Sequence, residues 1–241
     1  GVHVCIASGR AFDTLPEDII SVPGIEYAIT SNGAAIYRIA GKECLKSYLL
    51  TPSSVKTILN LTANDTVTYE AFIKGQAFAS TEYIRHPEKY GATEHSLAYV
   101  KKTRILKDDI KGFILEHCHE LDSLDIVVGD EELKKNIMDR IRKATDEVYM
   151  TSSISQLLEI SYKDAGKKSG VKFLTEYLGL SRENVAAFGD ADNDTDMIEY
   201  AGVGIAMENA APHLKQIADH VTLHHDKDGV AYAFRNILNI C

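Results

Sequence analysis

The chain has 241 residues, of which 45% are hydrophobic and 25% are charged, and its net charge at pH 7 is −9. These values are typical of a globular protein with one large domain or two modest ones. The excess of acidic residues argues against a nucleic-acid partner. The chain has no apolar run long enough to cross a bilayer, which argues against a membrane-spanning protein.

The first 48 residues predict a strand, a loop, a second strand and a hairpin. Val4–Ala7 is expected to be a core strand that ends in the turn Ser8-Gly9-Arg10. Tyr27–Thr30 is expected to be a second strand, followed by the turn Ser31-Asn32-Gly33. The segments Ala34–Ile39 and Glu43–Leu49 flank Ala40-Gly41-Lys42, which is a hairpin signal.

The region 49–159 mixes helices with hairpins. Thr51-Pro52 is a typical helix start, with threonine as the N-cap and proline in the first helical position. A hairpin is expected over 66–80, turning at Lys74-Gly75. Further helices are expected at 108–121 and 130–144, and strands at 97–100, 124–128, 146–151 and 156–161. This mixture predicts a separate α+β domain inserted into the rest of the chain.

From residue 160 onward, helices and strands alternate regularly. Lys167–Leu178 predicts a helix that Gly179 ends, and 185–188 predicts a buried strand. Later elements are expected at 194–201 (helix), 203–207 (strand), 211–218 (helix), 220–223 (strand) and 229–239 (helix). The predicted fold class is therefore α/β: a Rossmann-like core with a parallel sheet from residues 1–48 and 160–241, plus the inserted domain at 49–159.

An acidic loop directly follows the strand at 185–188. Four aspartates occur within seven residues: Asp190, Asp192, Asp194 and Asp196. Such crowded carboxylates repel one another unless a cation is near, and open α/β sheets bind ligands at this edge. A calcium loop would need glycine and glutamate where Thr195 and Ala201 stand. The loop therefore predicts a hard metal ion, Mg²⁺, and chemistry on an anion.

Other polar residues could bind the same anion. Ser8 and Gly9 offer a hydroxyl and free backbone N–H groups after a strand, although such a turn is also common without a ligand. Lys167 stands at a helix start, where a lysine is unfavourable unless it faces an anion. Asn32 is equally compatible with a simple turn former.

The four cysteines are widely spaced and contain no C-x-x-C pair, which argues against a disulfide framework or a zinc ribbon. They are Cys5, Cys44, Cys118 and Cys241. Free thiols in a reducing cytoplasm are the simpler interpretation, so a cytoplasmic location is expected.

Taken in order, these residues resemble the haloacid dehalogenase superfamily of phosphatases, specifically its Cof-type sugar-phosphatase group. The resemblance covers most of the two flanks, whereas 49–159 matches only in size and mixed character, as expected for that family's variable cap domain. The matching stretches are Ile6–Arg10, Ser31–Ala34, Leu158–Ile160 with Lys167, Phe188–Asp190 with Asn193, Asp194 and Met197, Ala206–Ala210, Ala218-Asp219 and Asp228–Val230.

The resemblance implies Mg²⁺-dependent hydrolysis of a small phosphate monoester, such as a sugar phosphate, through an aspartyl-phosphate intermediate. It implies that Asp190 and Asp194 hold the metal, with Asp194 supporting it or orienting Lys167, and that these three residues are catalytic. Substrate-binding residues would be Ser8, Gly9, Asn32, Lys167 and Asn193. The expected partner is a small-molecule phosphate ester, and the expected assembly is a monomer or a homodimer.

One part of the family pattern is missing. Its first motif, D-x-D-G-T, does not occur in the 241 residues, and Asp13-Thr14 follows the second motif at the wrong spacing. Because Gly1 leads directly into a predicted core strand, we expect upstream residues that carry the nucleophilic aspartate pair. Two alternatives stay open at this point: a phosphometabolite-binding homologue without catalysis, or a phosphomutase of the same superfamily.

Overall fold

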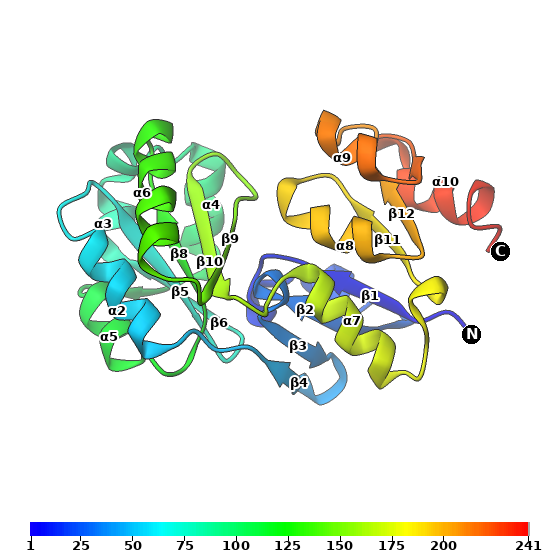
Figure 1. The fold of residues 1–241 in the computed structure, drawn as a ribbon, viewed down its shortest axis with the longest axis horizontal. Coiled ribbons are helices and arrows are strands. Elements are labelled where there is room, and N and C mark those ends of the chain that lie inside the picture. The colour runs from blue at the N-terminus through cyan, green and yellow to red at the C-terminus, as the bar shows by residue number, and fades with distance from the viewer. Residues whose placement is uncertain (241) are drawn as a thin grey trace. The chain divides into compact units, whose positions relative to one another are not determined.

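The computed structural model describes residues 1–240, apart from the side chain of His95 (Figure 1). Contacts within the chain divide it into two units, Gly1–Ala165 and Gly166–Cys241, and each is described separately. This division differs from the predicted one, which assigns 1–48 and 160–241 to a core and 49–159 to a cap. The predicted domains therefore stay a prediction. Within residues 1–240, no helix combines the length and apolar character that a membrane crossing requires.

The first unit begins with a four-stranded sheet in the order β1-β2-β3-β4. β1 runs parallel to β2, and the other neighbours are antiparallel. The elements are β1 (Val4–Ala7), α1 (Glu17–Ile20), β2 (Ile25–Thr30), β3 (Ala35–Arg38) and β4 (Glu43–Ser47). The predicted strands and hairpin are confirmed, and Gly41 turns the hairpin with a φ of +77°.

The expectation that Val4–Ala7 is a core strand is wrong in its burial. Val4 is 37% exposed and Cys5 is also exposed. The reason is that, within residues 1–240, β1 lies at the edge of its sheet and β2 is the strand that pairs with it. Cys5, Cys44 and Cys118 are free thiols, as predicted, while Cys241 lies outside the described residues.

The rest of the first unit is a six-stranded sheet in the order β7-β6-β5-β8-β10-β9. Its strands are β5 (Thr68–Ile73), β6 (Gln76–Ser80), β7 (Ile105–Lys107), β8 (Leu121–Val127), β9 (Val148–Thr151) and β10 (Leu157–Tyr162). Its helices are α2 (Pro52–Leu61), α3 (Thr81–Arg85), α4 (Glu94–Thr103), α5 (Ile110–Glu116) and α6 (Glu131–Ala144).

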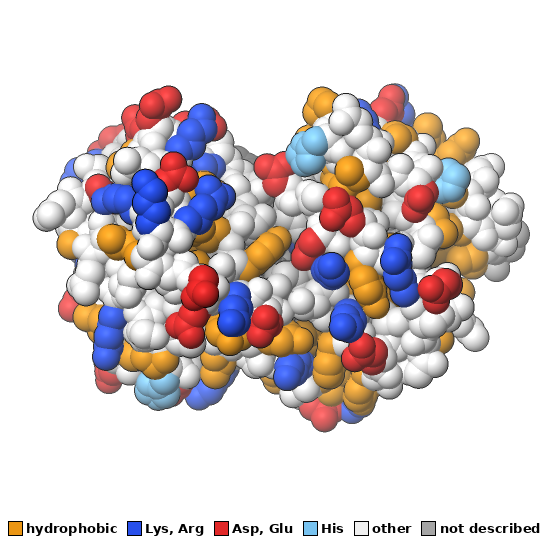
Figure 2. Space-filling view, viewed as in Figure 1, with side chains coloured by type: hydrophobic (Ala, Val, Ile, Leu, Met, Phe, Trp, Pro, Cys, Tyr) orange, Lys and Arg blue, Asp and Glu red, His pale blue; other side chains and the backbone are white. Residues whose placement is uncertain are grey.

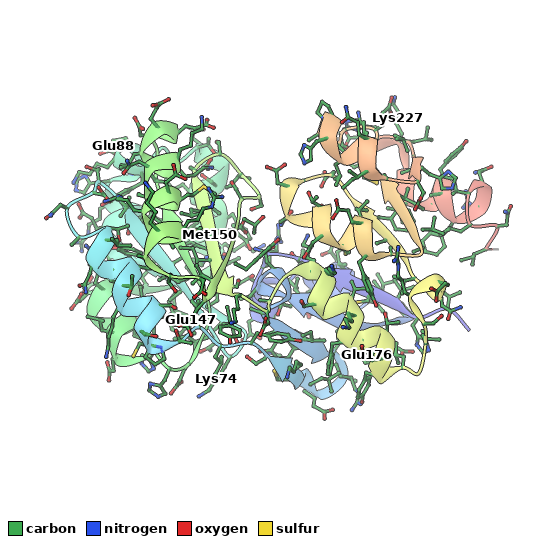
Figure 3. All side chains as sticks on the ribbon, viewed as in Figure 1. Lys74, Glu88, Glu147, Met150, Glu176 and Lys227 are labelled. Atoms are coloured by element: carbon green, nitrogen blue, oxygen red, sulfur yellow. The ribbon has the colours of Figure 1, made fainter. Side chains whose placement is uncertain are left out.

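The helix start at Thr51 forms as predicted. The Thr51 hydroxyl accepts a hydrogen bond from the Ser54 N–H. It also donates one of 2.9 Å to Glu147, which is labelled in Figure 3. The 66–80 hairpin is confirmed as well, with Lys74 and Gly75 at φ of +49° and +83°.

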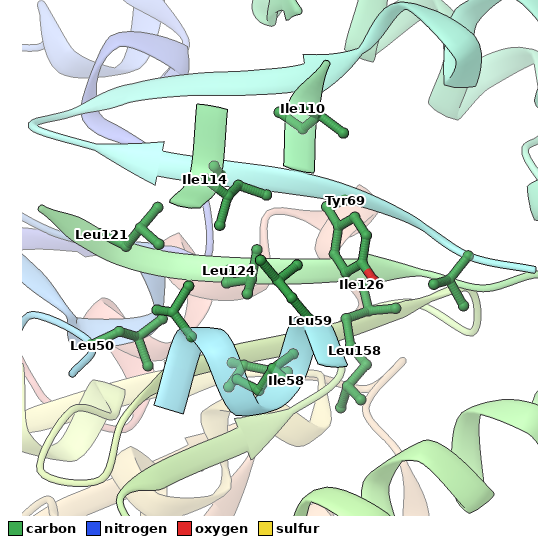
Figure 4. Packing of buried hydrophobic residues seen from close by; sticks show 14 of the residues in the cluster. Leu50, Ile58, Leu59, Tyr69, Ile110, Ile114, Leu121, Leu124, Ile126 and Leu158 are labelled. Carbon is green, nitrogen blue, oxygen red and sulfur yellow. The ribbon is translucent and has the colours of Figure 1, made fainter. Parts of the chain in front are cut away.

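One face of the six-stranded sheet is apolar and carries the main core of this unit (Figure 4). α2, α5 and α6 cover it, because each helix contributes buried aliphatic side chains to the same cluster. Successive residues of a strand point to opposite faces. Tyr69 and Ala71 of β5 therefore join the core, whereas Glu70 points to the other face.

Two predictions for this region are wrong or incomplete, and two elements were missed. The expected strand at 97–100 lies within α4, because Thr93 and Ser96 form a capping box that starts a helix there. The helix expected at 108–121 ends at Glu116, and β8 begins at Leu121. α3 and β7 were not predicted at all.

The second unit alternates helices and strands in the predicted order. Its elements are α7 (Lys167–Tyr177), β11 (Ala186–Gly189), α8 (Thr195–Tyr200), β12 (Val203–Ala206), α9 (Pro212–Ile217), β13 (His220–Val221) and α10 (Gly229–Asn236). β11, β12 and β13 form a parallel sheet in that order. The predicted α/β fold class with a parallel sheet is therefore confirmed.

Acidic and basic side chains both occur on the face of each unit that Figure 2 shows. This mixture agrees with the net charge of −9.

Candidate active site

The acidic loop after β11 is closed by Asp194. Its Oδ2 accepts hydrogen bonds from the backbone N–H of Asp190 (2.9 Å) and of Ala191 (3.1 Å). A Cβ on Gly189 would lie 2.4 Å from the Cβ of Asp194, so only glycine lets the carboxylate fold back over the strand end. The loop is therefore fixed by one buried carboxylate rather than by its own turn residues.

Lys167 and Asp194 form a buried ion pair. The Lys167 Nζ lies 2.5 Å from Asp194 Oδ1, and the side chains are 6% and 7% exposed. Removing two charges from water is costly unless the pair is close and the other polar atoms are also satisfied. Both conditions hold at Asp194, because its second oxygen has the two backbone donors. A lysine ammonium is thus held beside the acidic loop, at the first turn of α7.

Asp190 is exposed, in contrast to Asp194. Its Oδ2 accepts a hydrogen bond of 2.7 Å from Asn209 Nδ2. Asn209 is itself oriented by the His225 N–H, which donates to its Oδ1 at 3.2 Å. Asp190 is therefore an accessible carboxylate with a fixed orientation.

The other two aspartates of the loop have different surroundings. Asp192 is exposed and its Oδ1 lies 3.3 Å from His213 Nε2. Asp196 Oδ2 accepts from the Lys168 N–H at 3.2 Å, and burial raises the pKa of Asp196, which that hydrogen bond partly opposes. The four carboxylates that look equivalent in the sequence thus differ in exposure and partners.

The donor set at Asp190 fits a hard cation. Mg²⁺ usually binds one or two carboxylates and keeps several water molecules, so an exposed, oriented carboxylate suits it. Asp194 differs, because both of its oxygens already accept hydrogen bonds from Lys167 and the loop backbone. Its contacts suit a residue that orients Lys167.

In the first unit, two turns are joined by their backbones. We refer to Ser8–Arg10 as the SGR turn and to Ser31–Gly33 as the SNG turn. The Asn32 N–H donates to Ser8 O (3.1 Å), and the Ser31 N–H donates to Arg10 O (2.9 Å). Within the SGR turn, the Arg10 N–H donates to Ser8 Oγ at 3.2 Å.

The SNG turn is strained. Ser31, Asn32 and Gly33 have φ values of +48°, +52° and +88°, a left-handed conformation that side chains rarely adopt. Ser31 and Asn32 are nevertheless 2% exposed each. Strain of this kind costs about 1–3 kcal/mol per residue and concentrates at functional sites. The surrounding contacts must therefore hold the turn in this shape.

The predicted site residues form two groups. Ser8, Gly9 and Asn32 lie together in the first unit. In the second unit, Lys167 and Asp190 both contact Asp194, and the adjacent Asn193 is buried with it.

Two further residues contact these groups, although the sequence analysis gave them no role. Glu159 Oε1 accepts a hydrogen bond of 3.0 Å from Asn32 Nδ2, and Asn209 orients Asp190. Both residues lie in stretches that match the family pattern, Glu159 in Leu158–Ile160 and Asn209 in Ala206–Ala210. Neither stretch indicated which residue each side chain would contact.

Residues 1–234 match the family model of haloacid dehalogenase-like hydrolases. The 5-amino-6-(5-phospho-D-ribitylamino)uracil phosphatase YcsE of Bacillus subtilis is 28% identical over 98% of this chain and 82% of its own length. A Haemophilus influenzae protein is 37% identical over 105 residues, which are 44% of this chain and 40% of that protein. Among solved structures, the HAD subclass IIB sugar phosphatase BT4131 superposes with a TM-score of 0.83 at 20% identity, over 100% of this chain and 87% of that chain.

The α/β fold and the closed acidic loop thus define a haloacid dehalogenase-like protein. The chain belongs to the haloacid dehalogenase-like hydrolase family. The resemblance inferred from the sequence motifs is confirmed, as is the expectation of a hydrolase of this superfamily.

Proposed function

We propose that the protein is an Mg²⁺-dependent phosphatase that hydrolyses small phosphate monoesters, such as sugar phosphates or related metabolites. The proposed reaction proceeds through an aspartyl-phosphate intermediate. The observation that carries the proposal is the buried Lys167–Asp194 pair beside the exposed carboxylate of Asp190. The phosphatase names of relatives such as YcsE support the same reaction class.

In this proposal, each of the binding residues predicted from the sequence has a role toward the phosphoryl group. Ser8 Oγ and the Gly9 N–H donate to phosphate oxygens, and Asn32 and Asn193 orient them. Lys167 neutralises the charge that develops on these oxygens, which is the main work of a protein in phosphoryl transfer. D-x-D-G-T does not occur in the 241 residues, so the proposed roles concern binding and positioning.

We propose Asp190 as the residue that would hold Mg²⁺ directly. When bound, the metal supplies positive charge that offsets the negative charge of the transferring phosphoryl group. Asp194 supports the same site by fixing Lys167 and the backbone N–H groups of the loop. The proposed location is the cytoplasm, which the free thiols of the chain support.

The test is phosphate release by the full-length protein from a panel of sugar phosphates and p-nitrophenyl phosphate, with and without Mg²⁺. Asp190→Asn should lower kcat/KM by about 100-fold or more, because a neutral amide oxygen binds Mg²⁺ more weakly than a negatively charged carboxylate does. Asp192→Asn is the matched control, since Asp192 is exposed in the same loop and should change activity little. Equal activity of Asp190→Asn and the unsubstituted protein would exclude the metal role.

The same assay separates the alternatives. Binding of esters without any phosphate release would favour a binding protein, and an isomerised ester without free phosphate would favour a phosphomutase.

A further inference from the structure

Three carboxylates lie in a row across the six-stranded sheet, on the face opposite its apolar core. The carboxylate row consists of Glu70 on β5, Asp125 on β8 and Glu159 on β10. Asp125 is directly opposite Glu70 on one side and Glu159 on the other. The three residues are 1%, 3% and 3% exposed. Like charges at directly opposed positions destabilise a sheet, so this arrangement calls for an explanation.

Among the described residues, an ion-pair partner contacts the row at its Glu70 end. Arg104 Nε and Nη2 lie 2.7 and 2.6 Å from Glu70 Oε2. In the middle, Asp125 Oδ1 accepts from Ser123 Oγ at 3.1 Å. Burial raises the pKa of Asp125 well above its usual range, and the carboxylates of Glu159 and Glu70 raise it further. The charge of the row is thus compensated at Glu70 and crowded toward Glu159.

The Glu159 end contacts the SNG and SGR turns. Its Oε1 accepts from Asn32 Nδ2, while its Oε2 is buried without a hydrogen-bond partner among the described residues. A Cβ placed on Gly9 would lie 2.9 Å from Glu159 Oε1 and 3.2 Å from Asn32 Oδ1. The carboxylate therefore rests against the backbone of the SGR turn and fills the space that a side chain at Gly9 would need.

A carboxylate has chemistry that suits this place. Ionised glutamate offers hydrogen-bond acceptors and no donor, so it selects the orientation of Asn32 in which the amide NH₂ faces it. Asn32 then keeps its Oδ1 beside Gly9. Because Asn32 and Ser31 are held in a left-handed backbone conformation, a buried side-chain anchor at Asn32 adds to the backbone hydrogen bonds that keep that turn in place.

We propose that Glu159 is a positioning residue for phosphate binding: by anchoring Asn32, it holds the SNG turn against the SGR turn and keeps the Ser8 and Gly9 donors in place. The inference rests on the proposed function, since those donors are the groups assigned there to the phosphate. It also gives a physical reason for a third carboxylate in the buried row. Glu159 acts through Asn32 and does not itself touch the substrate.

The test compares three variants by calorimetric titration with inorganic phosphate and by Mg²⁺-dependent hydrolysis of p-nitrophenyl phosphate. Glu159→Met keeps the volume and removes the acceptor, so it should weaken phosphate binding about tenfold and raise KM in parallel. Glu159→Gln keeps a carbonyl for Asn32 and should restore binding to within about threefold. Asp125→Asn is the control, because it changes the same row one strand away, and it should also stay within about threefold.

Thermal unfolding of each variant shows whether the fold is kept. Glu159→Met removes a charge from a crowded row, so it should melt no lower than Asp125→Asn. The proposal is overturned if Glu159→Met binds phosphate as the unsubstituted protein does. It is also overturned if Asp125→Asn weakens binding as much as Glu159→Met, since the effect would then belong to the row and not to Asn32.

Hydrolysis and phosphate binding together distinguish the failure of the phosphatase proposal from the failure of the positioning role. If the protein hydrolyses no ester but its phosphate binding follows the expected order of variants, the phosphatase proposal fails and the positioning role stands. If the protein neither binds phosphate nor hydrolyses any ester, both are refuted; if it hydrolyses p-nitrophenyl phosphate and KM is the same in Glu159→Met as in the unsubstituted protein, the positioning role alone is refuted.

Discussion

Replacing Lys167 by methionine should destabilise the second unit strongly. The substitution leaves the Asp194 carboxylate, 7% exposed, without its ammonium partner at 2.5 Å. Breaking a buried ion pair by removing one partner costs about 3–5 kcal/mol. Asp194 keeps the two backbone donors of Asp190 and Ala191, so a loss near the lower limit, about 3 kcal/mol, is expected.

The double variant Lys167→Met/Asp194→Asn should recover most of that loss. An asparagine oxygen can still accept from the loop backbone, and no buried charge remains. Replacing a buried pair by neutral residues is often close to neutral, so the double variant should lie within about 1 kcal/mol of the unsubstituted protein. A large coupling free energy between the two substitutions would show that Lys167 and Asp194 stabilise the fold as a pair.

Native-state hydrogen exchange of backbone amides in α7 and β11 measures this free energy within the second unit itself. Lys168→Met is the control, because Lys168 is exposed and its backbone N–H contact to Asp196 is kept, so its effect should stay within about 0.5 kcal/mol. A loss below about 1 kcal/mol in Lys167→Met would refute the reasoning. So would a double variant that is as unstable as the single one.

Three further outcomes are expected. Burial raises the pKa of the Asp122 carboxyl from 3.8 to about 6, although the hydrogen bond from Ser47 lowers it. The folded state therefore favours the protonated carboxyl. The stability that this gives the fold is fully present below the unfolded pKa and is lost as pH rises through about 6. Asp122→Asn should therefore gain about 3 kcal/mol over the unsubstituted protein from about pH 4 to about pH 7 in urea unfolding, and a pH-independent difference would contradict this. Asn209→Ala should weaken Mg²⁺ binding about tenfold in a calorimetric titration, because it releases Asp190, and unchanged affinity would refute that role. Gly9→Ala should lower stability by about 1–3 kcal/mol in thermal unfolding, and adding Glu159→Ala should restore part of it, since the new Cβ would lie 2.9 Å from Glu159 Oε1. A fully additive pair would argue against that contact.

The sequence predicted the second unit more accurately than the first. Its strands are short apolar runs that end at turn residues, and Gly179 ends α7 with a φ of +68° as expected. These signals are local, so they can be found without knowledge of the partner elements. The acidic loop was predicted for the same reason, because its strand, glycine and aspartates are adjacent in sequence.

The first unit contains the clearest errors, and their cause is also physical. Residues 97–100 read as an apolar run, which periodicity alone cannot assign to a strand or a helix. The capping box between Thr93 and Ser96 starts a helix there. That helix buries Val100 in a cluster with Tyr83 and Val127, on the sheet face opposite the main apolar core. At β1, burial depended on how many strands pair with it, which an isolated apolar run does not reveal.

For the site residues as well, local sequence patterns gave the positions, whereas contacts across the fold determined the roles. Four neighbouring aspartates were equivalent by spacing, yet the fold leaves Asp190 exposed and buries Asp194 against Lys167. The Asn32–Glu159 hydrogen bond joins residues that are 127 positions apart, so no motif of short spacing could contain it. Sequence motifs therefore locate the groups that meet the ligand, whereas the residues that hold those groups in place are fixed by pairing across the fold. A buried strand does not favour a carboxylate opposite another carboxylate, as Glu159 is opposite Asp125. Where such a row of like charges lies next to a strained turn, it indicates a residue that holds the turn in place.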